Sequence, residues 1–128
     1  MKFYIGSGFR SSGLVNRYAG LLTREGWQHT FNWANIDRAG IGVEEMVRYA
    51  VLEQEGIAEA DVVIILLPAG RGTHIELGMA LAQHKRVFLC AEQEAEFSLE
   101  NTVNFYELPA IVKLVGTAEE NVEKILQA

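Results

Sequence analysis

The sequence predicts an α/β fold, a three-layer doubly wound sheet of about five parallel strands with helices on both faces. Apolar runs alternate with amphipathic segments along the whole chain, which is the pattern of repeated strand–helix–strand units. The run from Val62 to Leu67 is apolar at every position, as expected for a strand whose two faces are both covered. With 128 residues, of which 49% are hydrophobic, the chain has the size of one domain, spanning residues 1–128.

Five segments have the composition and the flanking turns of strands. They are residues 3–8, 27–33, 61–67, 86–91 and 111–115. The first ends in Gly-Ser-Gly, which is typical of a tight turn, and the second alternates only weakly. We expect the doubly wound strand order 2-1-3-4-5 of flavodoxin-like and other Rossmann-like folds.

Four amphipathic segments between and after these strands are predicted to be helices. They are residues 14–26, 43–60, 73–83 and the segment that follows residue 117. In the first, Leu14, Tyr18 and Leu21 recur at helical spacing, and Gly26 ends the pattern. The last begins with Thr117-Ala118-Glu119-Glu120, which is typical of a helix N-cap. Residues 92–104 form a polar connection to which the sequence assigns no regular structure.

Charge and composition exclude several classes of partner. The net charge is −6 and no basic cluster interrupts it, so a nucleic-acid polymer is not an expected partner. No apolar run approaches the roughly 20 residues that a membrane helix needs, and the first residues lack a signal-peptide pattern. The single cysteine, Cys90, cannot form an internal disulfide and is expected to be a buried packing residue. We therefore expect a cytoplasmic protein without a membrane partner.

In a doubly wound sheet, ligands bind beyond the carboxyl ends of the strands, beside the first strand. The turn after that strand contains Gly6, Ser7, Gly8, Phe9, Arg10, Ser11 and Ser12. Its backbone N–H groups, hydroxyls and guanidinium suit a phosphate, although it is neither a Walker loop nor a complete G-x-G-x-x-G motif. The alternative is an ordinary turn with a serine N-cap, and the sequence does not decide between the two.

The turn after the most apolar strand holds a second candidate. It contains Gly70, Arg71, Gly72 and Thr73, followed by Glu76. Thr73-x-x-Glu76 has the spacing of a capping box, in which both side chains would only satisfy the helix start. The alternative is a functional carboxylate, since the helix N-terminus would favour the ionised form of Glu76 at the expected ligand site. Arg71 would bind a phosphate there or face water.

Two further residues are candidates because of their positions. Glu53 is in helical register with Met46, Ala50 and Ile57, so that an acid lies on an apolar stripe. Such a carboxyl lies either at the wet edge of the stripe or in a functional site, where burial would raise its pKa. Tyr4 is inside the first strand, near the expected ligand site. Most strand tyrosines are packing residues.

The sequence contains no metal-ligand or cofactor motif. His29, His74 and His84 have no cysteine or acidic neighbours at ligand spacing, so neither a metal nor another cofactor is expected. There is also no G-x-S-x-G nucleophile elbow. Trp33 and Met46 are candidates to line a base pocket, and both are equally ordinary core residues.

Three stretches together resemble the nucleoside 2-deoxyribosyltransferase family, including its branch of 2'-deoxynucleoside 5'-phosphate N-hydrolases. They are Phe3-Tyr4-Ile5-Gly6-Ser7-Gly8-Phe9, Ala60-Asp61-Val62-Val63-Ile64 and Gly72-Thr73-His74-Ile75-Glu76-Leu77-Gly78-Met79-Ala80. The strand Lys85-Arg86-Val87-Phe88-Leu89 also fits, so the resemblance covers residues 2 to about 91. The Glu-Leu-Gly-x-Ala piece is its most specific part.

This resemblance implies a chemistry of the N-glycosidic bond in nucleosides or their 5'-monophosphates. Glu76 would be the nucleophile that forms a covalent ester with the sugar, and Tyr4 would orient its carboxyl. Glu53, which replaces the usual aspartate of the family, would protonate or hold the leaving base. Asp61 would be structural. The sugar would pass to another base in a transferase or to water in a hydrolase.

The resemblance also implies a homodimer or a larger homo-oligomer, because sites of the family borrow residues from a neighbouring subunit. Ser98, Asn101 and Asn104 are the candidates for such residues. Two other functions remain open. The stretch from Leu67 to Glu76 is similar to the signature of phosphoribohydrolases, which release a base from a ribonucleotide, although Ala69 interrupts it. A non-catalytic nucleotide-binding module would have the same fold.

Overall fold

The computed structural model describes residues 1–128, and its centre is one five-stranded parallel sheet. The strands are β1 (Lys2–Ser7), β2 (Gln28–His29), β3 (Val62–Leu66), β4 (Arg86–Ala91) and β5 (Ile111–Val115). Their order, β2-β1-β3-β4-β5, confirms the predicted doubly wound arrangement. Tyr4 of β1 is in register with Val63 of β3. Every residue of β3 is buried, as its uninterrupted apolar sequence predicts.

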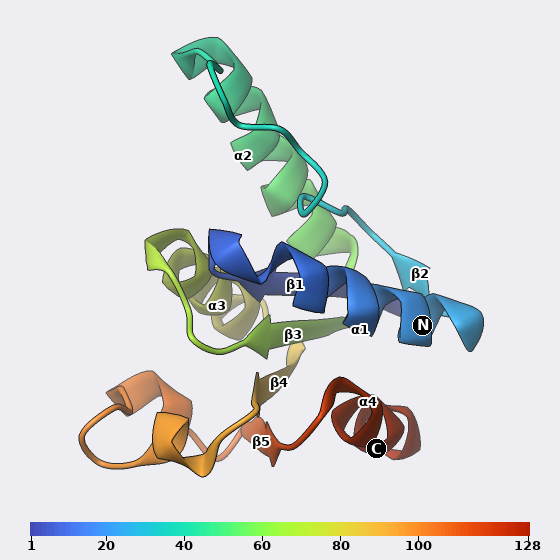
Figure 1. The fold of residues 1–128 in the computed structure, drawn as a ribbon, viewed down its shortest axis with the longest axis vertical. Helices are drawn as coiled ribbons and strands as arrows, with labels where there is room; N and C mark the ends of the chain where they lie inside the picture. The colour runs from blue at the N-terminus through green and yellow to red at the C-terminus, as the bar shows by residue number, and fades with distance from the viewer.

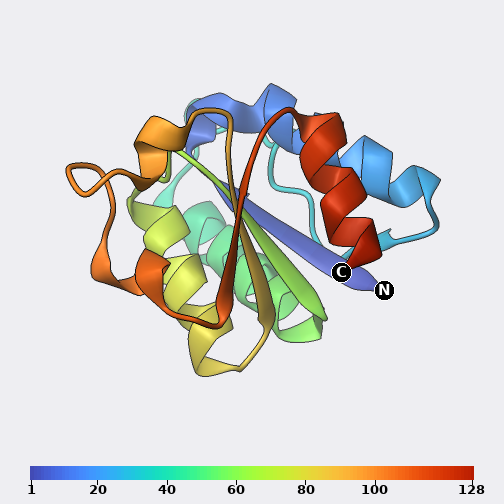
Figure 2. The ribbon, with the colours of Figure 1, turned by 90° about the horizontal axis from the view of Figure 1, so that it is seen from below.

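Two helices cover each face of the sheet (Figures 1 and 2). The helices are α1 (Ser12–Arg24), α2 (Val43–Glu59), α3 (Arg71–Ala82) and α4 (Ala118–Gln127). Helices α1 and α4 pack together on one face, and α2 and α3 lie on the other. No helix is long and apolar enough to cross a membrane. The predicted cap of α4 is confirmed, because the Glu120 N–H donates to Thr117 Oγ1 at 3.2 Å and the Thr117 N–H donates to Glu120 Oε1 at 3.0 Å.

The second predicted strand is wrong beyond its first residues. Strand β2 ends at His29, and residues 30–33 are loop. Thr30 still donates its N–H to the Phe3 carbonyl at 2.9 Å, but its hydroxyl turns to the Gly56 carbonyl of α2 at 2.7 Å. The indole N–H of Trp33 donates to the Ile5 carbonyl at 2.7 Å. Side-chain bonds to the backbone therefore replace the ladder of an edge strand here.

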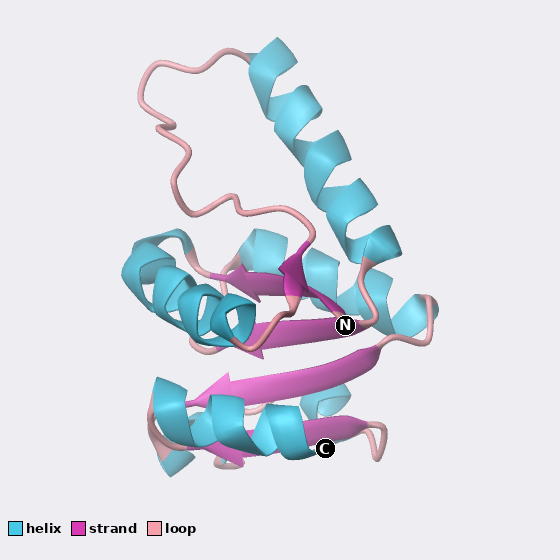
Figure 3. Cartoon of the chain, turned by 90° about the vertical axis from the view of Figure 1, so that its right-hand side faces the viewer, coloured by secondary structure: helices cyan, strands magenta, loops and turns pink.

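Only the second half of helix α2 packs against the sheet. Figures 1 and 3 show its first turns rising beyond the sheet, with the loop of residues 30–42 beside them. The apolar stripe of this helix was expected to face the core, but Met46 is 55% exposed and Val47 is 58% exposed. Only the last turns, with Gly56 and Ile57, are buried. The helical period was predicted correctly, whereas the direction of the stripe was not.

The connection after β4 contains two short 3₁₀ helices, η2 (Glu94–Phe97) and η3 (Asn104–Glu107). A third, η1 (Phe9–Ser11), lies in the turn between β1 and α1.

Cys90 is 1% exposed and burial raises the pKa of its thiol to about 12, so it is a packing residue, as expected. Asp61 binds the first strand through its carboxyl, which accepts from the Lys2 N–H at 2.9 Å.

Candidate active site at the carboxyl end of β1

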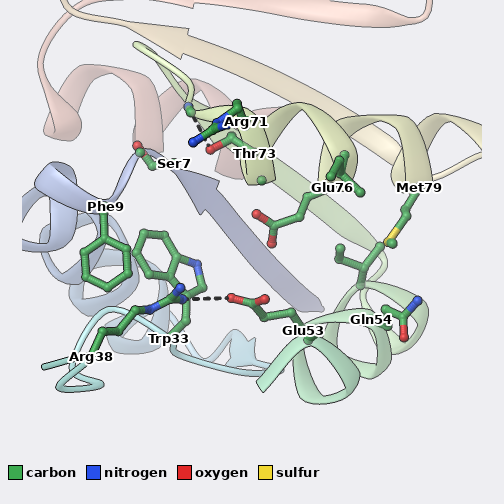
Figure 4. A pocket seen from close by; sticks show the side chains of 16 residues that line it. Ser7, Phe9, Trp33, Arg38, Glu53, Gln54, Arg71, Thr73, Glu76 and Met79 are labelled. Atoms are coloured by element: carbon green, nitrogen blue, oxygen red, sulfur yellow. Dashed lines mark hydrogen bonds and ion pairs between the residues drawn. The ribbon is translucent and has the colours of Figure 1, made fainter. Parts of the chain in front are cut away.

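A cavity of about 480 Å³ lies at the carboxyl end of β1, between α2 and α3. Its walls come from the turn after β1, the loop before α2, helix α2 and the first turns of α3 (Figure 4). The lining residues are Ser7, Gly8, Phe9, Trp33, Arg38, Ala50, Glu53, Gln54, Ile57, Gly70, Arg71, Gly72, Thr73, Ile75, Glu76 and Met79. This is the position at which a doubly wound sheet binds its ligand.

Glu76 lines this cavity, and its buried partner Tyr4 lies behind it. The Tyr4 hydroxyl donates a hydrogen bond to Glu76 Oε2. Tyr4 is fully buried, and burial and the neighbouring carboxylate raise the pKa of its phenol well above the ordinary value. The phenol therefore stays protonated and acts only as a donor to Glu76. No hydrogen bond of the protein engages the other oxygen, Oε1.

Glycines on both sides make room for this pair. A Cβ at Gly6 would lie 3.0 Å from the Ile65 Cδ1 atom and 3.6 Å from Glu76 Oε1. A Cβ at Gly56 of α2 would lie 3.1 Å from the Tyr4 ring. Gly6 was predicted to bind substrate, and in the structure it lies beside the Glu76 carboxyl without lining the cavity.

Helix α3 begins at a different residue from the one predicted, and as a result Glu76 takes no part in the N-cap. The helix begins at Arg71 rather than Thr73, and Thr73 Oγ1 accepts the N–H of the N-cap residue Gly70 at 3.1 Å. Of the two alternatives for Glu76, the capping box with Thr73 is therefore wrong. Glu76 lies in the second turn, too far along the helix to reach the free N–H groups of its start. Its carboxyl points into the cavity instead (Figure 4).

The protonation of Glu76 also differs from the expectation. The helix N-terminus was expected to favour the ionised carboxylate, but burial raises the pKa of Glu76 from 4.5 to about 7. The Tyr4 hydrogen bond and the Arg38 charge lower this pKa, whereas the charge of Glu53 raises it. Desolvation dominates because the macrodipole effect fades beyond the first turn. Near neutral pH, Glu76 is therefore partly protonated.

Glu53 and Arg38 form the opposite wall. The Glu53 side chain is 24% exposed, and burial raises the pKa of its carboxyl, the direction expected from the sequence. Arg38 Nη2 lies 3.4 Å from Glu53 Oε1, and the Arg38 charge lowers that same pKa. Arg38 is a residue that the sequence analysis missed. It lies in a polar loop without a motif, and only the fold brings it to α2.

The glycine-rich turns after β1 and β3 touch each other. A Cβ at Gly8 would lie 3.3 Å from the Pro68 carbonyl oxygen, so the two turns approach at backbone distance. Gly70, Arg71, Gly72 and Thr73, which were predicted to bind substrate, line the cavity. Ser7 also lines it, but its hydroxyl donates to the Leu66 carbonyl at 2.9 Å.

The predicted phosphate turn is only partly at the cavity. Phe9 lines it, whereas Arg10, Ser11 and Ser12 do not, and Arg10 is exposed. The Ser12 hydroxyl donates to the Phe9 carbonyl at 2.9 Å.

Of the two candidates for a base pocket, Trp33 lines the cavity and Met46 does not. Ser98, Asn101 and Asn104 are exposed and line no part of it. No group of three or more His, Cys, Asp or Glu side chains is arranged to hold a metal ion.

The fold and the site can be compared with known proteins. The chain matches no protein-family profile and no curated protein sequence. Among solved structures, the CMP N-glycosidase BcmB from Clostridium botulinum superposes with a TM-score of 0.68 at 18% identity, over 98% of this chain and 98% of that one. A conserved protein from Enterococcus faecalis V583 superposes with a TM-score of 0.67 at 18% identity, over 99% of this chain and 98% of that one.

These likenesses show the fold class alone, an α/β fold with a five-stranded parallel sheet and helices on both faces. They extend over almost the whole chain, including residues beyond 91, where the resemblance in sequence is weak. One of the two similar structures is a nucleotide N-glycosidase.

Proposed function

We propose that this protein is an enzyme that cleaves the N-glycosidic bond of nucleosides or their 5'-monophosphates. The observation that supports the proposal most is that Glu53 of α2 and Glu76 of α3 line one cavity, while Tyr4 of β1 bonds to Glu76 from behind its wall. The cavity, at about 480 Å³, has the volume of a small-molecule site. The N-glycosidase with the same fold adds independent support.

In the proposed reaction, the free oxygen Oε1 of ionised Glu76 attacks the anomeric carbon of the sugar. The bond from that carbon to the base breaks, and its electron pair leaves with the base, which takes up a proton. Glu53 protonates or holds the departing base across the cavity. The sugar then remains as an ester of Glu76 until water or a second base attacks the same carbon.

The positive groups of the cavity suit a substrate that carries a 5'-phosphate. Arg71 lies at the N-terminus of α3, where backbone N–H groups also favour an anion. The glycines at positions 8, 70 and 72 leave this part of the wall without side chains. We therefore include nucleoside 5'-monophosphates in the proposed substrate class.

The test is an incubation of the protein with deoxynucleosides, deoxynucleoside monophosphates and ribonucleoside monophosphates, with and without a free acceptor base. Chromatography measures the released base, and intact-mass spectrometry detects a sugar ester on the protein. Release in water indicates a hydrolase, and release only with an acceptor indicates a transferase. Release from ribonucleotides alone, without a covalent ester, would favour a phosphoribohydrolase.

Glu76→Gln separates an enzyme from a binding module. The variant keeps the shape and the hydrogen bond to Tyr4 but lacks the nucleophilic carboxylate, so we expect it to bind substrate and to lose base release. Glu55→Gln is the matched control, because Glu55 is an exposed residue of α2 that does not line the cavity. If the wild type releases no base from any of these compounds, the proposed function is wrong.

We also propose that the chain forms a homodimer or a larger homo-oligomer. The exposed stripe of α2, which consists of Val43, Met46, Val47, Ala50 and Val51, has no partner within the chain. An apolar helix face of this length is usually covered in a folded protein. Ala50 also lines the cavity, so a second copy on this stripe would lie at the cavity mouth.

A further inference from the structure

Arg38 links two walls of the cavity that come from different parts of the chain. Its guanidinium carbon lies 4.2 Å from the centre of the Phe9 ring, and its Nη2 atom lies 3.4 Å from Glu53 Oε1 (Figure 4). We propose that Arg38 is a positioning residue, which rests on Phe9 and holds the Glu53 carboxyl at the wall that faces Glu76. The assignment rests on the proposed function, since it concerns the same cavity.

The loop that carries Arg38 is anchored on both sides of it. The Asn16 side chain of α1 donates to Asn35 Oδ1 at 2.9 Å, which attaches the loop to the helix after β1. The Asp37 carboxyl accepts the Ala39 N–H at 2.9 Å, which closes a turn around Arg38. The backbone of Arg38 is therefore held in place. A guanidinium stacked on an aromatic face loses less freedom on pairing than a lysine would.

The charged and titratable groups around this position determine what Arg38 does. Glu53 of α2 and Glu76 of α3 face it, and Tyr4 of β1 lies behind Glu76. The Arg38 charge lowers the pKa of both carboxyls and opposes their burial. Arg71 lines the same cavity but is not among the causes of either shift. Of the two arginines in the cavity, only Arg38 therefore acts on the charges of Glu53 and Glu76.

Loss of the Arg38 guanidinium has two consequences. Without its hydrogen-bond donor, the Glu53 carboxyl can turn away from the leaving base, which slows the step that breaks the glycosidic bond. Without its charge, both carboxyls keep their protons to higher pH. Since this ion pair is partly exposed and water screens it, we expect upward pKa shifts of only about 0.5 units.

The experiment compares Arg38→Met, Arg38→Lys and Arg71→Met across a range of pH. We expect Arg38→Met to lower kcat more than it changes KM, and to move both limbs of the pH profile of kcat/KM upward. On the acid side of the profile, a shift of 0.5 units lowers kcat/KM about threefold. Arg38→Lys should restore both limbs of the pH profile but not kcat, because lysine keeps the charge and loses the guanidinium that lies over the Phe9 ring and pairs with Glu53. Arg71→Met should raise KM and leave both limbs in place.

A second measurement does not depend on activity. Carbon NMR of protein labelled at the glutamate carboxyls gives the pKa values of Glu53 and Glu76 in the wild type and in Arg38→Met, with Arg38→Gln as a second variant. An upward shift of both supports the proposal, and unchanged values overturn it. If the wild type releases no base, the proposed function fails, and this titration still decides the position and charge effect of Arg38.

Discussion

The hydroxyl of Tyr4 donates a hydrogen bond to Oε2 of Glu76, which lies 72 positions further along the chain. Strand β1 supplies the donor and the second turn of α3 supplies the acceptor. The bond leaves Oε1 of Glu76 toward the cavity and lowers a pKa that burial alone would raise further. The orientation and the charge of Glu76 therefore both depend on Tyr4.

The first prediction concerns this hydrogen bond. Tyr4→Phe removes a bond that lowers the pKa of Glu76, so that pKa should rise above about 7 and the acid limb of kcat/KM should move to higher pH. A hydrogen bond to a charged group is worth about 1.5–3 kcal/mol, which corresponds to a loss of roughly tenfold or more in kcat/KM. Kinetics of base release between pH 5 and 9 measure both effects.

Tyr18→Phe is the matched control, because Tyr18 is also buried but bonds to Asn121 on the opposite face of the sheet. Its pH profile should equal that of the wild type. An unchanged acid limb in Tyr4→Phe would contradict the role assigned to Tyr4.

The second prediction is that Glu76 destabilises the folded protein at neutral and alkaline pH. The folded pKa of about 7 exceeds the ordinary 4.5, so the folded state binds more protons between these values and the free energy of unfolding falls as the pH rises through them. At pH 8 the cost is on the order of 2–3 kcal/mol. Glu76→Gln should therefore be more stable than the wild type at pH 8 and equal to it near pH 4, as measured by denaturant unfolding. Equal stability at pH 8 would show that burial does not raise this pKa.

The third prediction concerns His29, which is stacked on Phe3 with ring centres 4.5 Å apart. Burial lowers the pKa of His29 from 6.5 to about 4, so the unfolded state binds the extra proton, and the contribution of His29 to stability falls as the pH drops from 6.5 toward 4, opposite in sign to that of Glu76. After allowance for partial exposure, the loss is about 1–2 kcal/mol. His29→Phe should remove this part of the pH dependence in unfolding experiments.

The control for this prediction is His84→Asn. His84 is exposed and has φ of 57°, a conformation that asparagine tolerates. The variant should have the same pH dependence of stability as the wild type, and if His29→Phe has it too, His29 makes no contribution to it.

The fourth prediction compares two helical glycines. A Cβ at Gly56 would lie 3.0 Å from the Phe31 Cβ atom and 3.1 Å from the Tyr4 ring, so Gly56→Ala should push α2 away from β1 and cost about 1–3 kcal/mol. Gly20 of α1 has nothing within 4 Å of its Cβ position, and Gly20→Ala should stabilise the protein by about 0.5–1 kcal/mol. Thermal unfolding distinguishes the two. Equal effects would mean that α2 does not approach β1 as closely as described.

The fifth prediction concerns the exposed stripe of α2. Val47→Glu places a charge in the middle of the stripe, so it should dissociate the proposed oligomer into monomers, because burial of an unpaired charge is costly. Light scattering coupled to size-exclusion chromatography measures the mass. Glu55→Lys, an exposed change on the same helix, should leave the mass unchanged. A monomeric wild type would refute the proposed oligomer.

Local pattern accounts for the part of the structure that was predicted. The strand of residues 62–66 and the cap at Thr117 depend on hydrophobic period and on short-range hydrogen bonds, which a single sequence displays. The order of the sheet was expected from the alternation of strands and helices, which is typical of a doubly wound fold. The same holds for the position of the cavity, because parallel strands place their following turns at one edge. Glu53 and Glu76 line the cavity there, and Tyr4 bonds to Glu76.

Packing between distant segments accounts for what was missed. Helical period alone does not say whether an apolar helix face packs against the sheet. The first half of α2 extends beyond the edge of the sheet, so its apolar face is exposed. The bond of Thr73 to Gly70, not to Glu76, depends on where the turn after β3 meets Gly8. Arg38 lies in a loop without a motif, and it reaches Glu53 only after that loop folds over Phe9.

The amino-acid sequence by itself thus determined the layers, the strand order and the carboxyl and phenol groups available at one end of the sheet, because these follow from periodicity and chain direction. The tertiary structure alone decided the pKa of Glu76, the partner of Glu53 and the exposed face of α2. Desolvation and charge act through space, and neither depends on distance along the chain.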